Sequence, residues 1–263
     1  MSRIIPFFQV DAFASKPLEG NPAAVMPLTE WLDDATLAAI AAENNLSETA
    51  FTVPSARDDA DYDLRWFTPT VEVDLCGHAT LGAAHVLLEG ERIRFATRSG
   101  ILSVTRGEEG LLELDLPSNP VAEADVPGLL GALGLPSGTP TFAGRGGNGA
   151  AIALLADEEA VRAVSPDFAA LKAVDRLVMV TAPGKDTAIA SRVFAAYHGI
   201  DEDPVTGSAH TALTPFWAER LGCSRFSAFQ ASRRGGYLEC RLEGDRVILG
   251  GRAVTVIEGH FQL

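Results

Sequence analysis

Four polar side chains in this sequence could handle a proton: Glu48, His78, Asp203 and Ser208. Glu48 lies in the segment 46–53, whose residues alternate as in a strand, so the glutamate shares a face with apolar neighbours. A carboxylate on such a face can take a proton from a ligand and give it back. Most strand glutamates are simply solvated, and that is the alternative for Glu48.

Two predicted helix starts accompany these side chains. One begins at Thr206-Gly207-Ser208 and the other at Gly77-His78. The free backbone N–H groups and the positive dipole end of a helix start favour a carboxylate or an enolate-like anion. The sequence therefore predicts that a small acid binds where these helices begin.

Each candidate also has a purely structural interpretation. Asp203 precedes Pro204 and could simply form the turn, and His78 could bond to a backbone carbonyl at the helix start. Four possible metal ligands have a spacing that matches no zinc pattern: Asp74, Cys76, His78 and His85. The glycine run at 144–149 contains no P-loop lysine and does not open a helix after a strand. We therefore expect neither a metal site nor a nucleotide site.

The composition fits a globular enzyme. The chain has 263 residues, 47% of them hydrophobic, and a formal net charge of −14. Its basic residues are scattered, which makes nucleic acid and anionic membranes poor partners. No segment has the features of a signal peptide or reaches membrane-spanning length, and the three cysteines suggest no disulfide framework. These features predict a cytoplasmic protein with one large domain or two half-sized ones.

The segment 75–90 predicts a helix that is buried on all sides, because it is apolar apart from His78, Thr80 and His85 before Glu89. Strands in the same half are expected at 4–11, 46–53, 63–67, 92–97, 101–106 and 111–116. A helix inside a curled antiparallel sheet is the arrangement that would bury such a helix.

From 118 to 140 the composition shifts to proline, glycine and small residues, which predicts a linker. In the helix that starts near Ser208, Pro215 removes one hydrogen bond, so we expect a kink near Thr211. Strands that follow this helix are expected at 225–230, 237–242, 246–249 and 253–258.

The order of features repeats along the chain. Three segments resemble earlier ones at a nearly constant offset: 147–152 resembles 20–25, 192–194 resembles 65–67, and 207–209 resembles 77–79. Such an ordered match predicts a duplicated domain. We expect an N-terminal domain over 1–118 and a C-terminal domain over 119–263, whose last strand could return to the first. If the two halves face each other, both helix starts converge on one interdomain cleft.

Four motifs, in order, carry a resemblance to a known family: VDAFASKPLEGNPAAV, NNLSETAF, RWFTPTVEVDLCGHATLGAAHVL and DEDPVTGSAH. They are similar to those of the phenazine-biosynthesis PhzF-like isomerases, which have the diaminopimelate-epimerase-like fold. The resemblance covers the chain from about residue 7 to its end. It implies an α+β fold with two pseudo-repeated domains, each a curled, mostly antiparallel β-barrel around a central helix. It also implies a cofactor-free enzyme for a small carboxylate-bearing substrate, commonly a homodimer.

The resemblance assigns residue roles as well. Glu48 falls on the family's proton-transferring glutamate, and His78, Asp203 and Ser208 fall on groups that orient the substrate or handle protons. Other residues of the same motifs are expected to bind the substrate: Asn21, Ser47, Cys76, Gly77, Thr206 and Gly207.

The repeat aligns Cys76 with Thr206, whereas two-thiol epimerases of this fold carry a cysteine at both positions. Because threonine cannot act as a thiolate base, we expect an isomerase in which Glu48 moves a proton between two carbons. Two alternatives stay open. One is an amino-acid racemase or epimerase that uses Cys76 with Glu48 or Asp203, and the other is a non-catalytic protein that binds a small acid.

Overall fold

The structure is a computed structural model that describes residues 3–144 and 149–263. Its contacts divide the chain into two compact units, the first formed by Met1–Asp115 with Leu249–Leu263 and the second by Leu116–Ile248. The expected boundary after residue 118 lies three residues further along the chain. The expected C-terminal range 119–263 also included 249–263, a segment that belongs to the first unit.

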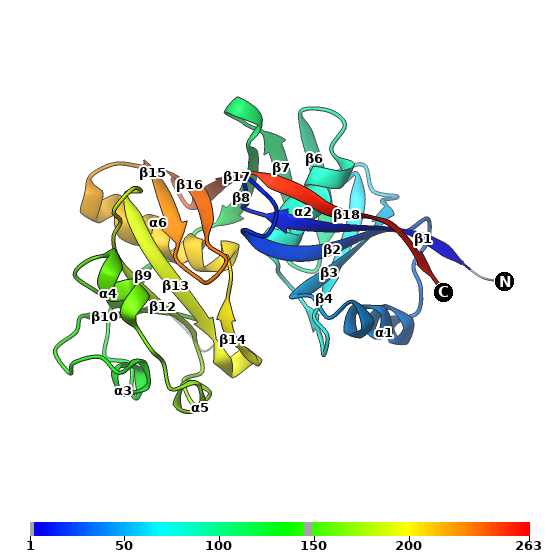
Figure 1. Ribbon diagram of the computed structural model, residues 1–263. Helices are drawn as coiled ribbons and strands as arrows, with labels where there is room; N and C mark the ends of the chain where they lie inside the picture. Colours follow the sequence, from blue (N-terminus) through cyan, green and yellow to red (C-terminus); the bar gives the residue numbers. More distant parts are fainter. Residues whose placement is uncertain (1–2, 145–148) are drawn as a thin grey trace. The chain divides into compact units, whose positions relative to one another are not determined.

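The first unit is a mixed sheet with two main helices (Figure 1). Its strands are β1 (Ile4–Ala12), β2 (Asn21–Pro27), β3 (Glu48–Pro54), β4 (Tyr62–Phe67), β5 (Glu72–Val73), β6 (Arg92–Thr97), β7 (Gly100–Arg106), β8 (Leu112–Pro117) and β18 (Ala253–Gln262). The two main helices, α1 (Asp34–Asn44) and α2 (Gly77–Leu87), connect strands that run parallel, namely β2 with β3 and β4 with β6. The other pairings are antiparallel, including that of β1 with β18, which brings the two chain ends together.

The helices α1 and α2 pack against different residues of the first unit's sheet. On α1, Leu37 and Ile40 pack into a cluster with Phe51 of β3. On α2, the residues from Gly77 to Ala84 are all buried, and at Gly82 an added Cβ would lie 3.6 Å from Val10 and Val25 of the sheet. The prediction of a helix buried nearly all round is therefore confirmed up to Ala84, while His85 is exposed.

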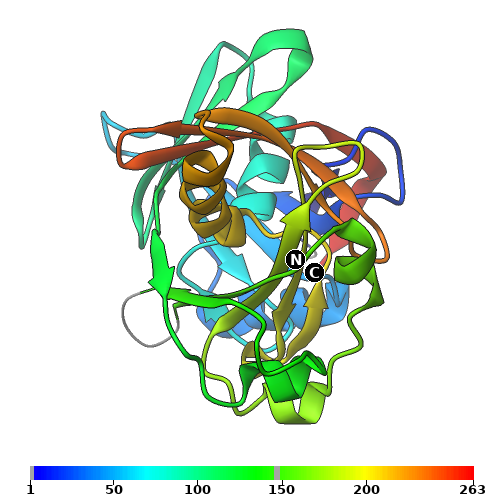
Figure 2. The same ribbon diagram turned by 90° about the vertical axis from the view of Figure 1, so that its left-hand side faces the viewer.

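The second unit also contains both parallel and antiparallel strand pairs (Figure 2). Its strands are β9 (Val121–Glu123), β10 (Thr141–Gly144), β11 (Ala150–Leu154), β12 (Leu177–Pro183), β13 (Ile189–Ala195), β14 (Ile200–Asp203), β15 (Arg225–Gln230) and β16 (Gly236–Glu243), and β17 (Arg246–Gly251) continues into the first unit. Its helices are α3 (Leu129–Leu133), α4 (Glu158–Ala163), α5 (Phe168–Leu171) and α6 (Gly207–Leu221). Side chains of α3, α4 and α5 form an apolar core with β11, β12 and β13, and α6 contacts β16.

The two units repeat one pairing pattern. In the first, β2 runs parallel to β3, β3 antiparallel to β4, β4 antiparallel to β5 and parallel to β6, and β6 antiparallel to β7. In the second, β11, β12, β13, β14, β15 and β16 pair in the same sequence of directions. The long helix crosses between equivalent strands in both units, α2 before β6 and α6 before β15. The duplication inferred from weak sequence matches is therefore present in the strand order.

A duplicated ion pair supports each copy. Arg65 of β4 binds Glu72 of β5 through two hydrogen bonds of 2.7 and 2.8 Å, and its guanidinium lies 5.1 Å from the ring of Phe67. In the second unit, Arg192 of β13 binds Glu202 of β14 at 2.8 and 2.9 Å. These paired contacts hold each short strand beside its neighbour just before the long helix begins.

Two segments with the composition of loops form regular structure. Asn21–Pro27 forms β2, because Asn21 and Pro22 begin a strand that is buried against β1 and β3. The expected linker 118–140 contains β9 and α3, which bury Leu129 and Leu133. Residues 145–148 lie outside the described residues. They include most of the glycine run at 144–149 and the first two residues of the segment 147–152 that resembles 20–25.

Helix α6 continues through Pro215. Proline has no N–H group, so the carbonyl of Thr211 loses its usual partner within the helix. The backbone N–H of Asn119 donates to that carbonyl at 3.0 Å. Asn119 thus supplies the hydrogen bond that Pro215 cannot donate. The expected kink near Thr211 stays a prediction.

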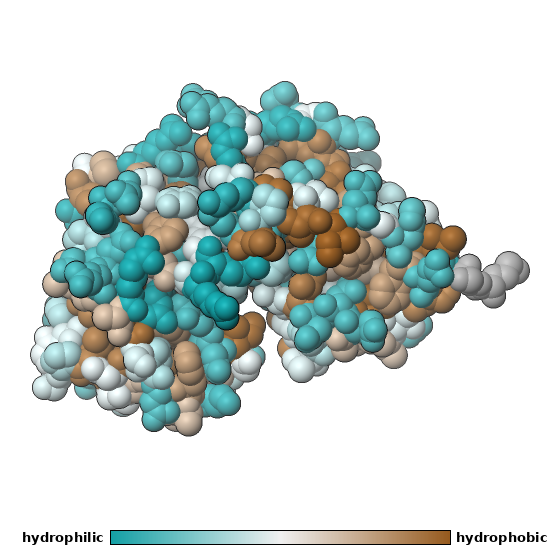
Figure 3. All heavy atoms as spheres, viewed as in Figure 1, coloured by the Kyte–Doolittle hydropathy of each residue, from teal (hydrophilic) through white to brown (hydrophobic). Residues whose placement is uncertain are grey.

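The surface is mostly hydrophilic on the face shown in Figure 3, with hydrophobic residues gathered in a few areas. Large apolar side chains that are exposed include Ile4, Leu18, Val71 and Tyr237. Within residues 3–144 and 149–263, none of the helices combines the length and apolar character needed to cross a membrane.

Candidate active site

The starts of α2 and α6 have equivalent backbones. Cys76 is the N-cap of α2 with φ −145° and ψ 107°, and Thr206 is the N-cap of α6 with φ −119° and ψ 101°. Neither side chain caps its own helix. The first N–H groups of both helices therefore point out of the helix without an intrahelical partner, as an anion-binding site requires. This geometry also confirms the alignment of Cys76 with Thr206.

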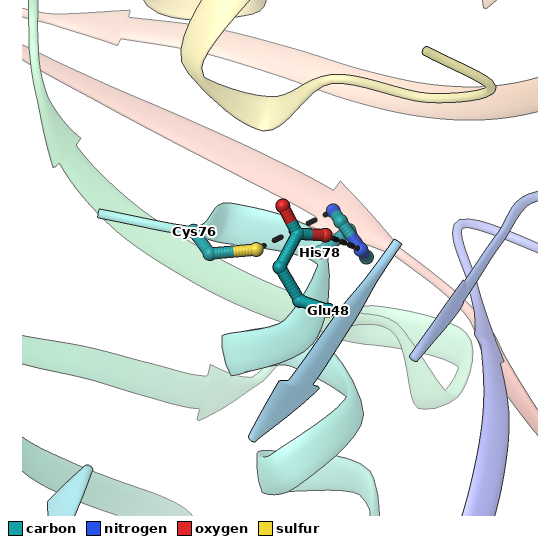
Figure 4. A group of neighbouring side chains, drawn as sticks. All are labelled: Glu48, Cys76 and His78. Atoms are coloured by element: carbon teal, nitrogen blue, oxygen red, sulfur yellow. Dashed lines mark hydrogen bonds and ion pairs between the residues drawn. The ribbon is translucent and has the colours of Figure 1, made fainter. Parts of the chain in front are cut away.

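At the start of α2, Glu48 of β3 and His78 point toward each other (Figure 4). Glu48 Oε2 lies 3.0 Å from His78 Nε2, and the two side chains are 12% and 5% exposed. The two atoms lie at ion-pair distance, and both are buried without a hydrogen bond of acceptable geometry among the described residues. Two buried polar atoms with unused hydrogen-bonding capacity are unusual and indicate a place where a ligand or a proton is taken up.

Cys76 lies on the other side of the His78 ring, with Sγ 3.5 Å from Nδ1 (Figure 4). Burial and the neighbouring charge of Glu48 raise the pKa of the Cys76 thiol to about 11. Cys76 therefore carries its proton at neutral pH and is a poor base there.

The pKa of His78 is subject to opposing effects. Burial of the ring lowers it, and negative charge on Cys76 and Glu48 raises it; with both neighbours charged, the pKa lies well above the usual value. Because the Cys76 thiol is uncharged at neutral pH, Glu48 is the partner that favours a charged ring in that range.

Two further polar side chains contact this group. Ser47 Oγ donates to Asn21 Oδ1 at 3.1 Å, and Asn21 Nδ2 lies 3.2 Å from His78 Nδ1. Asn21 is completely buried. The parallel pairing of β2 with β3 sets Ala23 opposite Glu48, which brings the beginnings of both strands to the start of α2.

At the start of α6, Asp203 is buried and accepts a hydrogen bond from the hydroxyl of Thr206. Gln230 of β15 joins this pair: its Oε1 accepts from the Thr206 backbone N–H at 2.9 Å, and its Nε2 donates to the Asp203 carbonyl at 2.7 Å. Ser232 Oγ donates to the Pro204 carbonyl at 2.7 Å. Hydrogen bonds with Gln230 of β15, and with Ser232 just after this strand, thus hold the turn that carries Asp203.

The pairing registers show which residues are equivalent in the two units. Ala23 pairs with Glu48 as Ala150 pairs with Leu177, so a leucine occupies the position of Glu48 in the second unit. Trp66 pairs with Val73 as Val193 pairs with Asp203, so a valine occupies the position of Asp203 in the first. Each unit therefore carries a single carboxylate at its site, and the two carboxylates stand at non-equivalent positions.

One group of possible metal ligands occurs among the described residues, formed by Glu48, Cys76 and His78, whose ligand atoms lie within 4.8 Å of one another. The set considered from spacing is not brought together, since Asp74 is 77% exposed and His85 contacts Thr255. A cation between Glu48, Cys76 and His78 would have to displace the proton of a thiol whose pKa is about 11. The donor set therefore suits proton handling better than metal binding.

The structure brings the expected residues into two groups, one in each unit. The first contains Asn21, Ser47, Glu48, Cys76, Gly77 and His78, and the second contains Asp203, Thr206, Gly207 and Ser208. Ser208 is half-buried, and its carbonyl accepts from Thr211 Oγ1 at 2.7 Å. Sequence reasoning missed Gln230, because nothing local marks it and it lies 24 residues beyond Thr206.

Comparisons with known proteins agree with this geometry. Residues 10–259 match the family described as phenazine biosynthesis-like protein. The chain is 50% identical over 266 residues to an uncharacterized isomerase of Pseudomonas aeruginosa, with 98% of this chain and 99% of that protein covered. The crystal structure of a PhzF-family phenazine biosynthesis protein of Enterococcus faecalis is similar with a TM-score of 0.90 and 44% identity, covering 99% and 100% of the two chains. A hydroxyproline epimerase from Agrobacterium vitis, at 12% identity and a TM-score of 0.64 over 99% and 93% of the chains, shares the fold alone.

Proposed function

The chain belongs to the phenazine biosynthesis-like protein family, and from that premise we propose how this isomerase works. Glu48 moves a proton within a small carboxylate-bearing metabolite, acting first as base and then as acid, and no cofactor takes part. The observation that carries the proposal is the buried contact of Glu48 with His78 beside the open start of α2, in which both facing atoms lack a hydrogen bond within the described part of the chain.

The chemistry is a balanced proton shift. The Glu48 carboxylate removes a proton from one carbon, and the electron pair left behind spreads into the substrate as an enolate-like anion. The N–H groups at the start of α2 stabilise that negative charge. Glu48 then returns the same proton to a second carbon on the same face, so the enzyme ends in its original state.

Two observations favour this isomerisation over stereoinversion. Inversion at one carbon needs a second base on the opposite face, and the thiols of two-thiol epimerases supply it. Here Cys76 keeps its proton to a pH of about 11, and the equivalent residue of the second unit is Thr206. The second unit also has Leu177 in place of a second Glu48. A single carboxylate that works on one face of the substrate is consistent with these residues.

We propose that Asp203 and Ser208 orient the same substrate, as the family resemblance implies. The buried turn fastened by Gln230 gives Asp203 the fixed position that such a role needs. Each unit is further proposed to be a curled barrel of strands around its long helix, and the protein to be a homodimer. Sedimentation of the purified chain tests the last point.

Incubation in D2O tests the function before the substrate is known. A panel of small unsaturated and keto carboxylates is incubated with the protein, and NMR follows both the isomerised product and the incorporation of deuterium. We expect one class of compound to exchange or isomerise with the native chain and not with Glu48→Gln. Glu43→Gln, at an exposed glutamate of α1, is the matched control and should retain full activity.

Three outcomes would count against the proposal. Full turnover by Glu48→Gln on an identified substrate would remove the assigned base. Deuterium that enters an α-carbon with inversion, lost in Cys76→Ala, would identify an epimerase. Binding of an acid in calorimetry with neither isomerisation nor exchange in any compound that binds would identify a non-catalytic binding protein.

A further inference from the structure

The buried amide of Asn21 has two different ends, and the structure orients them. Its oxygen accepts from Ser47 Oγ at 3.1 Å, and its nitrogen lies 3.2 Å from His78 Nδ1. Asn21 is the first residue of β2, and pairing of that strand with β3 fixes it close to Glu48. The amide is therefore placed to act on the ring of His78 without contact to solvent.

The nitrogen of an amide carries only donors, so the His78 Nδ1 that it meets must offer a lone pair. A neutral imidazole with a lone pair on Nδ1 carries its proton on Nε2. Nε2 is the atom that lies 3.0 Å from Glu48 Oε2. The orientation of Asn21 thus places the ring proton on the side of Glu48.

A protonated ring does not fit this arrangement. In an imidazolium, Nδ1 also carries a proton, which would face the amide hydrogens of Asn21. The groups that face the ring therefore oppose one another: Glu48 from β3 favours the charged ring, the Cys76 thiol is uncharged at neutral pH, and Asn21 favours the neutral ring. Reversing the amide would present its oxygen to Nδ1, and Ser47 would then have to accept instead of donate.

We propose that Asn21 is a positioning residue that holds His78 as the neutral tautomer protonated on Nε2. This inference rests on the proposed function of Glu48. With Nε2 already protonated and Nδ1 turned to Asn21, His78 cannot take the proton that Glu48 removes from the substrate. The proton stays on Glu48 and returns to the same substrate molecule instead of passing through the ring to solvent.

The nitrogen NMR spectrum of the full chain, labelled with 15N at histidine, tests the proposal without substrate. The chain has five histidines, and the signals missing from His78→Gln identify those of His78. At neutral pH we expect Nδ1 to be unprotonated and Nε2 protonated in the native chain. In Asn21→Asp the new carboxylate accepts a proton from Nδ1, so both nitrogens should become protonated.

Asn44→Asp is the matched control, because Asn44 donates to Thr49 in the same unit and has no contact with His78 among its hydrogen bonds. It should leave the His78 signals unchanged. A native spectrum with the proton on Nδ1, or with both nitrogens protonated at neutral pH, would overturn the proposal. So would an unchanged spectrum in a folded Asn21→Asp chain, and the native spectrum decides alone if that variant does not fold.

A second measurement connects the tautomer to the reaction. With substrate deuterated at the donor carbon, Asn21→Ala should lower the fraction of deuterium retained in the product several-fold, while Asn44→Ala retains it. Equal retention in both variants would contradict the proposed consequence. The nitrogen spectra and the activity of Glu48→Gln are independent, so failure of the Asn21 proposal and failure of the proposed function can be told apart.

Discussion

The starts of α2 and α6 share a backbone and differ in almost every side chain that could do chemistry. Both helices begin after an extended N-cap, and in both units a bidentate arginine–glutamate pair holds the preceding short strand. Yet the first unit carries Glu48 where the second has Leu177, and the second carries Asp203 where the first has Val73. The backbone framework is the same in both units, and the polar side chains at the two helix starts differ.

This difference bears directly on mechanism. A reaction with two equivalent bases would need the same kind of group at equivalent positions. In the second unit, the residue equivalent to Cys76 is Thr206, whose hydroxyl donates a hydrogen bond to Asp203. Among the described residues, only the first unit combines a carboxylate with a facing imidazole, and we therefore assign the proposed proton transfer to Glu48.

The largest loss of turnover is expected when Glu48 of the first unit is replaced by leucine, the residue at the equivalent position of the second unit. Glu48→Leu puts the second unit's leucine into the first and should lower turnover by about 10³-fold, the range that a general base contributes. Leu177→Glu is the reciprocal change and should leave turnover within a few-fold of native. The rates of both variants on one substrate check this, and similar losses in the two would contradict the proposed asymmetry.

The duplicated ion pairs allow the shared framework to be tested. Arg65→Met and Arg192→Met each remove the arginine that binds a poorly exposed glutamate and should lower the free energy of unfolding by about 2–4 kcal/mol. Glu72 keeps its ion pair with the more exposed Arg98 in the first variant. Arg192→Met should cost more, because Arg192 also donates to the Val164 carbonyl at 2.6 Å. Denaturant titration measures both.

The control for these variants is Arg57→Met, since Arg57 and Asp59 form an ion pair with both side chains more than half exposed. Its loss should cost no more than about 1 kcal/mol. An equal effect of all three substitutions would show that the duplicated pairs do not hold the framework.

A smaller loss is expected from the amide that fastens the turn of Asp203. Gln230→Leu keeps the volume but leaves the Thr206 N–H and the Asp203 carbonyl without this partner, at a cost of about 1–3 kcal/mol. Gln262→Leu, at an exposed position of β18, should change stability by less than about 0.5 kcal/mol. If the two variants are equally stable in thermal unfolding, Gln230 does not hold the turn.

The smallest perturbation is a change of pH. In a Cys223→Ser background, which removes the exposed thiol, alkylation of Cys76 should rise about tenfold per pH unit and level off only near pH 11. Glu48→Gln removes a neighbouring negative charge and should lower the pKa of Cys76, which makes alkylation faster at a given pH. Mass spectrometry of the Cys76 peptide measures the rate. A plateau below pH 9 would mean that Cys76 is an activated thiol after all.

Much of this arrangement could be predicted from local sequence. The apolar run around Gly82 predicts a buried helix, and the motifs around Glu48 and Asp203 point to the site. Asp33 or Asp34 ahead of an apolar-periodic run predicts an N-cap, and the Asp33 carboxylate accepts a hydrogen bond from the Thr36 N–H. These predictions succeed because each depends on residues that are neighbours in the chain.

The rest depends on pairing between distant segments. Asn21 and Pro22 have the composition of a loop, and only the neighbouring strands make them the start of β2. The equivalence of Leu177 with Glu48 follows from strand register, because the intervening segments differ in length. Gln230 has no sequence signal, since its role exists only once β15 lies beside β13.

The comparison of Glu48→Gln with Cys76→Ala decides between the carboxylate and the thiol as the proton-transferring group. On the first substrate identified, we expect kcat/KM to fall by about 10³-fold in Glu48→Gln and by no more than a few-fold in Cys76→Ala. An inactive Cys76→Ala beside an active Glu48→Gln would contradict this expectation and assign the proton transfer to the thiol.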